Sequence, residues 1–83
     1  MSIMVRLEKI KRTDEFIETE YYPEDTMSRG YIKIDNDKKV VKKELSSEEG
    51  YVKTYFNHAR KRLIEYLGLP KEKVPEKTVV MWY

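Results

Sequence analysis

A single long helix is the feature that most constrains this chain, because the sequence marks both of its ends. Ser46 is suited to cap the helix N-terminus with its hydroxyl, and Glu49 completes a Ser-x-x-Glu capping box. At the other end, Gly68 is suited to close a helix in the left-handed conformation, and Pro70 cannot continue one. These signals predict a helix over residues 46–67.

The predicted helix has one apolar face and one polar face when its residues are placed at about 100° intervals. A broad apolar stripe is typical of a helix that lies on a sheet. The stripe comprises Val52, Tyr55, Phe56, Ala59, Leu63, Tyr66 and Leu67. The opposite face comprises Lys53, Thr54, Asn57, Arg60, Lys61 and Glu65.

The rest of the chain has the pattern of short strands separated by polar turns. Alternation of apolar and polar residues, bounded by turn-forming residues, predicts strands over residues 3–8, 16–22, 30–34, 39–45 and 79–83. Residues 35–38, Asp-Asn-Asp-Lys, are the expected turn of a hairpin. The order ββββαβ predicts an α+β fold, in which a mainly antiparallel four- to five-stranded sheet packs in two layers against one long helix.

The last predicted strand differs from the others in being apolar on both faces. Residues 79–83 read Val-Val-Met-Trp-Tyr. A strand of this kind is typically central in a sheet or covered on both sides. We therefore expect it to insert at the middle of the sheet or to pair with another subunit, and the sequence leaves both arrangements open.

Length and composition predict one small domain, residues 1–83. The chain has no cysteine, which excludes disulfides and thiolate metal sites. Charged residues make up 39% of the chain but the formal net charge is only +2, which argues against a strongly basic binder. The N-terminal segment carries charges within its apolar pattern, unlike a signal peptide or a membrane span. We expect a cytoplasmic protein with no membrane partner.

No motif in the sequence indicates a catalytic centre. His58 is the sole histidine, and no nucleophile stands in a recognisable context beside it. Glu18 and Glu20 belong to an acidic stretch, residues 14–25, that would suit a divalent cation or a paired acid and base. The alternative is a solvated strand face whose carboxylates pair with basic neighbours such as Lys42. We expect the second arrangement, and hence no enzyme, no metal and no cofactor.

Tyrosine is the most unusual part of the composition, with seven residues in a chain of 83. One helix covers only one face of a sheet, so some tyrosines are expected on the other face, where aromatic side chains favour protein contacts. The predicted function is a protein-interaction or accessory module that self-associates or binds a protein partner. The residues expected at its interface are Tyr21, Tyr22, Tyr31, Trp82 and Tyr83.

A nucleic-acid-binding module is the alternative function. The polar outer face of helix 46–67 is rich in basic groups that would contact phosphates. The expected contacts are Lys53, Asn57, Arg60 and Lys61. The competing explanation is an ordinary solvated face neutralised by Glu49–Lys53 and Lys61–Glu65 pairs.

Overall fold

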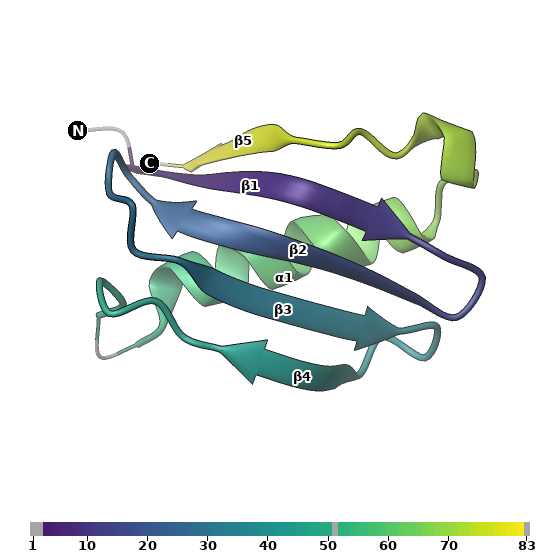
Figure 1. Ribbon diagram of the computed structural model, residues 1–83, viewed down its shortest axis with the longest axis horizontal. Coiled ribbons are helices and arrows are strands. Elements are labelled where there is room, and N and C mark those ends of the chain that lie inside the picture. Colours follow the sequence, from purple (N-terminus) through teal and green to yellow (C-terminus); the bar gives the residue numbers. More distant parts are fainter. Residues whose placement is uncertain (1–2, 51, 83) are drawn as a thin grey trace.

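The computed structural model describes residues 3–50 and 52–82. Within these residues, five strands form one antiparallel sheet and one α-helix packs across one of its faces (Figure 1). The elements are β1 (Ile3–Arg12), β2 (Phe16–Pro23), β3 (Gly30–Asp35), β4 (Val40–Glu44), α1 (Thr54–Leu67), the 3-10 helix η1 (Lys71–Lys73) and β5 (Thr78–Trp82). The prediction of a two-layer α+β fold with the order ββββαβ is confirmed.

The strand order in the sheet is β4-β3-β2-β1-β5. The first four strands form a meander of consecutive antiparallel pairs, and the chain then returns through α1 to add β5 beside β1 (Figure 1). Of the two arrangements left open for the last strand, insertion at the middle of the sheet is therefore wrong, since β5 lies at an edge, and pairing with another subunit stays a prediction. The tight turns at residues 13–15 and 36–39 keep β1 beside β2 and β3 beside β4, so a late strand joins most simply at an outer edge.

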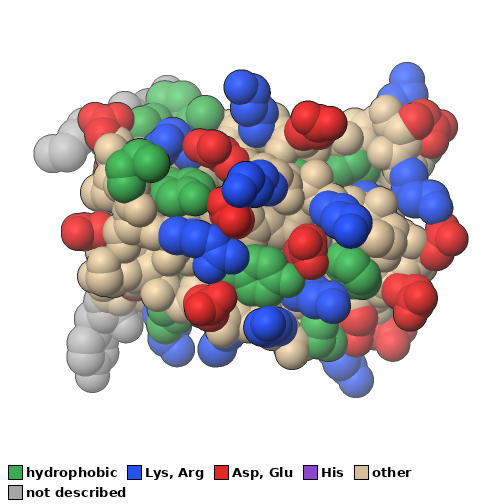
Figure 2. Space-filling model, viewed as in Figure 1, with side chains coloured by type: hydrophobic (Ala, Val, Ile, Leu, Met, Phe, Trp, Pro, Cys, Tyr) green, Lys and Arg blue, Asp and Glu red, His purple; other side chains and the backbone are tan. Residues whose placement is uncertain are grey.

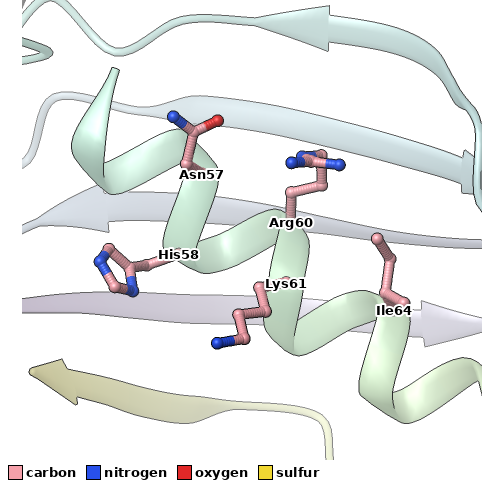
Figure 3. A pocket seen from close by; sticks show the side chains of 5 residues that line it. All are labelled: Asn57, His58, Arg60, Lys61 and Ile64. Atoms are coloured by element: carbon pink, nitrogen blue, oxygen red, sulfur yellow. The ribbon is translucent and has the colours of Figure 1, made fainter. Parts of the chain in front are cut away.

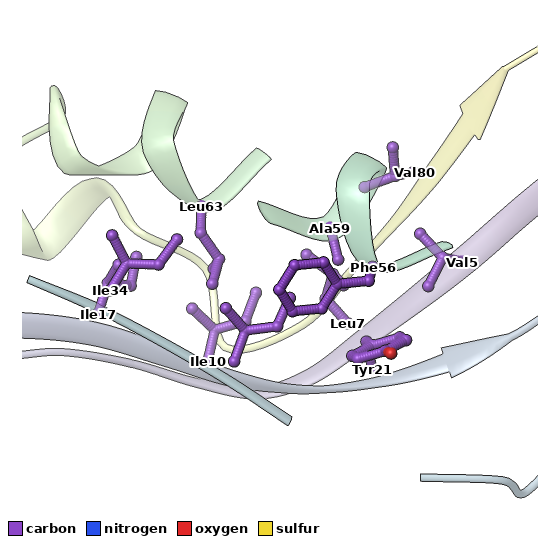
Figure 4. Packing of buried hydrophobic residues seen from close by; sticks show 11 residues of the cluster. Val5, Leu7, Ile10, Ile17, Tyr21, Ile34, Phe56, Ala59, Leu63 and Val80 are labelled. Atoms are coloured by element: carbon purple, nitrogen blue, oxygen red, sulfur yellow. The ribbon is translucent and has the colours of Figure 1, made fainter. Parts of the chain in front are cut away.

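The core lies between the sheet and α1, and period-two alternation decides which strand residues enter it. On β2, for example, Ile17, Thr19 and Tyr21 are buried whereas Glu18 and Glu20 lie on the opposite face. Phe56, Ala59 and Leu63 are the buried residues of α1 and pack onto this layer (Figure 4). The remaining apolar members of the core are Val5, Leu7, Ile10, Ile32, Ile34 and Val80.

A β-bulge extends β1 beyond the predicted strand. The alternation that buries Val5 and Leu7 would bury Lys9 next, and the register of β1 with β2 shifts between Glu8 and Lys11. Lys9 adopts a left-handed backbone (φ 55°), and the extra residue turns Ile10 into the core instead. The strand therefore continues to Arg12, beyond the strand predicted over residues 3–8.

The helix begins at Thr54, so the predicted start at Ser46 is wrong. The Ser46 backbone N–H donates to the Tyr21 hydroxyl (3.0 Å), and the Ser46 hydroxyl donates to the Ser28 carbonyl (2.8 Å). The same hydroxyl accepts from the Glu48 N–H (3.2 Å) and stabilises a turn instead of a helix. Ser46 thus fastens the segment after β4 to the sheet, and the helix starts only after this anchor.

Glu49 still caps the helix, but from outside it. Its Oε1 accepts from the Phe56 N–H at 2.6 Å, across a chain reversal in which Lys53 has a left-handed backbone (φ 54°). Because the helix starts late, Val52 falls outside the apolar stripe in which it was predicted and is 70% exposed. The predicted end at Leu67 is confirmed, although Gly68 closes the helix in a right-handed conformation (φ −81°).

Candidate interaction surfaces

The outer edge of β5 is the first candidate surface. The hydrogen bonds of β1, the strand beside β5, show which backbone groups of β5 are open. The Met4 carbonyl accepts from the Glu24 N–H, so the N–H and C=O groups of Met4 point to β2. Those of the residues on either side of Met4 therefore point to β5. By the same alternation, Val79 and Met81 direct their N–H and C=O groups to the outer edge. No described residue pairs with that edge.

Apolar side chains accompany these open backbone groups. Val79 is 47% exposed and Met81 is 57% exposed, and both lie on the face of the sheet opposite α1. The sequence left open that strand 79–83 pairs with another subunit, but Val79 and Met81 are not among the aromatic residues predicted at the interface. Their exposure follows from the edge position of β5, which no local pattern reveals.

Trp82 sits on the other face of β5, toward the helix. The His58 ring stacks on it with a centroid distance of 3.7 Å and an interplanar angle of 11°, and Tyr55 meets its edge at 5.9 Å. The predicted interface residue Trp82 is therefore half-buried and joins β5 to α1. His58, the sole histidine, takes part in this stack and has no nucleophile as a hydrogen-bond partner among the described residues.

The opposite edge of the sheet, β4, is protected against strand pairing. Its sequence, Val-Val-Lys-Lys-Glu, places lysines at the centre, and the pairing with β3 is irregular between Lys33 and Ile34. Charged side chains, lysine above all, and bulges are the usual devices that keep an edge strand from pairing. The two edges of this sheet thus differ in chemistry.

The open face of the sheet, opposite α1, carries interspersed acidic, basic and hydrophobic side chains (Figure 2), and its tyrosines bond to glutamates instead of forming a free aromatic surface. The Tyr22 hydroxyl donates to Glu20 Oε1 (2.8 Å), and the Tyr31 hydroxyl donates to Glu18 Oε1 (2.9 Å). The Arg6 guanidinium lies 5.2 Å from the centroid of the Tyr22 ring. The predicted interface residues Tyr22 and Tyr31 are thus on the open face, and both are engaged within it.

The Glu20 carboxylate is neutralised by two cations, whereas Glu18 forms no salt bridge with any described residue. Arg29 Nε lies 3.1 Å from Glu20 Oε2, and Lys9 Nζ lies 3.8 Å from the same atom. The Tyr22 hydroxyl bond and then the Arg29 guanidinium lower the pKa of Glu20. Burial, together with the Glu18 carboxylate, raises the pKa of Tyr31 to about 12. The expected ion pairing is thus found for Glu20 alone, and its partners are Arg29 and Lys9 instead of Lys42.

Two predicted interface residues are not on a described surface. Tyr21 is fully buried beneath α1, and its ring meets Phe56 edge-on at 6.2 Å. Burial, reinforced by Glu49, raises the pKa of Tyr21 well above its usual range. Tyr21 is therefore a core residue. Tyr83 lies outside the described residues.

The outer face of α1 is the second candidate surface. Asn57, Arg60, Lys61 and Ile64, at helical spacing, surround a shallow hollow of about 400 Å³ that His58 also borders (Figure 3). The two ion pairs expected to neutralise this face do not form. Glu49 caps the helix instead, and Glu65 pairs with Arg62 at 3.7 Å.

The remaining acidic groups form no metal centre among the residues that the structure describes. Within residues 3–50 and 52–82, no three metal-ligating side chains converge. Asp14, at the β1–β2 turn, pairs with Lys71, whose ammonium lowers the pKa of the carboxyl. Asp35 accepts from the N–H groups of Asp37 (2.9 Å) and Lys39 (3.0 Å), which makes residues 35–38 a hairpin turn as predicted.

Comparisons with known proteins add no family to this description. No protein-family model matches the chain, and no curated protein or solved structure shows significant similarity to it. In the described part of the chain, the helix lacks the length and apolar character needed to cross a membrane.

Proposed function

We propose that this protein is a non-enzymatic interaction module that self-associates through the outer edge of β5. The observation that carries the proposal is an edge strand with open backbone groups and two exposed apolar side chains, Val79 (47%) and Met81 (57%). Adding a strand satisfies such backbone groups, and apolar side chains on the new pair shield one another from water.

The contrast between the two edges supports this choice of surface. β4 carries adjacent lysines at positions 42 and 43, whereas β5 has no charged residue between Thr78 and Trp82. An apolar edge strand without charged side chains favours pairing with another chain. The tyrosines of the open face are a weaker candidate, since their hydroxyls already donate to Glu18 and Glu20.

The oligomeric state of the full chain tests the proposal. Sedimentation analysis over increasing protein concentration should show a dimer with a dissociation constant on the order of 1 μM to 1 mM, as suits a short two-strand interface. Met81→Lys should abolish the dimer, because it places a charge on the unguarded edge. Val41→Lys is the matched control, since Val41 lies on the other edge with a similar exposure of 54%.

Three outcomes contradict the proposal. The wild-type protein could stay monomeric up to about 1 mM. Met81→Lys could leave the dimer intact, or Val41→Lys could disrupt it to the same extent. Far-UV circular dichroism of each variant should be used to check that the variant remains folded.

Nucleic-acid binding by the outer face of α1 is a second candidate function. It is supported by Arg60 and Lys61 on α1 and by Lys53 just before the helix, which form no salt bridge with any described carboxylate, and by the hollow that Arg60 and Lys61 border. Phosphates bind such groups with an affinity that falls as salt rises.

Fluorescence anisotropy with labelled single-stranded oligonucleotides tests this second function. Binding should weaken with salt and should be lost in Arg60→Glu/Lys61→Glu. Lys73→Glu, on η1, is the control for a charge change elsewhere. Binding that ignores salt, or that falls equally in the control, would exclude this face as the contact.

A further inference from the structure

Resting on the self-association proposed above, we infer that two copies pair β5 with β5 antiparallel, about a twofold axis that passes beside Val80. The two five-stranded sheets would then form one continuous sheet. Each copy would contribute the same strand, which gives a closed, symmetric dimer.

The direction of the backbone groups on β5 limits the pairings that can form. Val79 and Met81 point outward, so only these residues, and others at odd-numbered positions, can form hydrogen-bonded pairs across the new interface. With the axis at Val80, Val79 of each copy lies opposite Met81 of the other, and both of these pairs are hydrogen-bonded ones. Val80 then faces Val80, as a non-hydrogen-bonded pair in which side chains approach closely.

This register is the one that overlaps the whole of β5, Thr78–Trp82, with its copy. Shifting the axis to Val79 would place Lys77 opposite Met81 and leave Trp82 beyond the paired segment. On the open face, the central register brings Val79 and Met81 of the two copies into one apolar cluster. Apolar side chains directly opposite each other are the stabilising unit of an antiparallel pair.

A hollow beside the edge fits the same register. It measures about 380 Å³ and is lined by Arg6, Leu7, Glu8, Lys77, Thr78 and Val79. Under the twofold axis, Met81 of one copy lies opposite Val79 of the other, next to this hollow. The long side chain therefore has space to pack without moving the strand.

The chemistry of the edges favours a second copy of β5 over the other strand that this chain offers. Pairing β4 with its own copy about its central residue would set Lys42 against Lys42, a destabilising contact between like charges. Pairing β5 with β4 would leave one edge of each kind open and generate an open filament rather than a closed dimer. The β5 pair brings no charged side chain of its own strand into the contact.

Because the chain contains no cysteine, disulfide cross-linking between single introduced cysteines can identify the register of the β5 pair. We would prepare Val79→Cys and Met81→Cys separately and oxidise each alone and as an equimolar mixture. In the inferred register, residues 79 and 81 of opposite copies have Cα atoms about 5.5 Å apart, within disulfide range. Identical residues lie on a diagonal at about 7–8 Å, beyond that range. The disulfide dimer should therefore form in the mixture and not in either variant alone.

The outcomes separate this inference from the proposal beneath it. Cross-linking of Val79→Cys alone or Met81→Cys alone would establish another register and overturn the inference. A wild-type dimer without cross-linking in the mixture would also overturn it, while leaving self-association standing. A monomeric wild-type protein would remove both. Val41→Cys mixed with Val79→Cys should not cross-link, and cross-linking there would indicate pairing of β5 with β4.

Amide hydrogen exchange gives a second readout on the unmodified protein, in case a cysteine weakens the dimer. Raising the protein concentration should slow exchange at the Val79 and Met81 N–H groups. The Val80 N–H, which already points to β1, should change little. Equal protection of all three, or of none, would overturn the inferred pairing.

Discussion

Gly30 provides a sharp test of how the sheet and the helix fit together. It lies opposite Tyr21 in the β2–β3 pair, and the Tyr21 ring covers it. A Cβ added at Gly30 would lie 2.1 Å from Cε1 and 2.2 Å from Cζ of that ring. The Tyr21 ring cannot move aside without losing contacts, because it is fully buried against Phe56 and its hydroxyl accepts from the Ser46 N–H. Gly30→Ala must therefore displace a buried aromatic side chain or bend β3.

The cost of that change follows from the contacts that would be lost. Overpacking a core typically costs about 1–3 kcal/mol, and losing a buried aromatic ring costs about 3–5 kcal/mol. We expect Gly30→Ala to lower the free energy of unfolding by at least about 3 kcal/mol, which combines part of both effects. A chain of 83 residues has a total stability of roughly 4–12 kcal/mol, so the loss is large.

Urea unfolding followed by far-UV circular dichroism measures this loss. Gly50→Ala is the matched control, because an added Cβ there meets no atom within 4 Å and the glycine has no positive φ. The control should be neutral or stabilising by up to about 1 kcal/mol. The reasoning also predicts that Gly30→Ala adds little further cost once Tyr21→Ala has removed the ring. A Gly30→Ala variant within about 1 kcal/mol of wild type, or full additivity of the two changes, would refute it.

Three further predictions concern protonation, backbone strain and helix capping. The pKa of the Tyr31 hydroxyl is raised to about 12 in the folded protein, so the unfolded chain loses the hydroxyl proton at lower pH. The free energy of unfolding should therefore fall as pH rises from about 10 to 12. Tyr31→Phe should reduce this pH dependence, as measured by urea unfolding at each pH. Lys38→Gly should stabilise the protein by about 1 kcal/mol because Lys38 has a left-handed backbone (φ 67°), whereas Lys39→Gly should not. Thermal unfolding of the two variants measures the difference, and equal shifts of the unfolding midpoint would contradict the expected relief of backbone strain. Glu49→Ala should cost about 1–2 kcal/mol in the same assay by removing the acceptor of the Phe56 N–H, and an unchanged midpoint would show that this cap contributes nothing.

The sequence predicted the elements of the fold well where local patterns decide them. The alternation on β2, with Thr19 and Tyr21 inward and Glu20 outward, follows from period two alone. The helix start was not predictable in this way. Ser46 has every local property of an N-cap, but its backbone and hydroxyl bond to Tyr21 and Ser28, which are distant in sequence. A tertiary anchor thus overrides a local signal.

The candidate site was predictable only in part, for the same reason. The helix face around Arg60 and Lys61 follows from helical periodicity, and the structure places these residues around one hollow. Tyr21 was expected at an interface, but its position in the alternation of β2 buries it. Val79 and Met81 gained their exposure from the strand order, which depends on where α1 returns the chain.

The position of β5 at the edge of the sheet does not explain why its open face is apolar. A strand buried on both sides needs apolar residues on both faces, whereas an edge strand with one solvated face usually alternates. β5 has apolar residues at Val79 and Met81 on its outward face, although no described element covers them. The first strand beside it does alternate, with Arg6 and Glu8 on that same face. The departure is thus local to the one edge that lacks lysines, and the proposed pairing with a second copy would give these two side chains the apolar surroundings that a single copy does not.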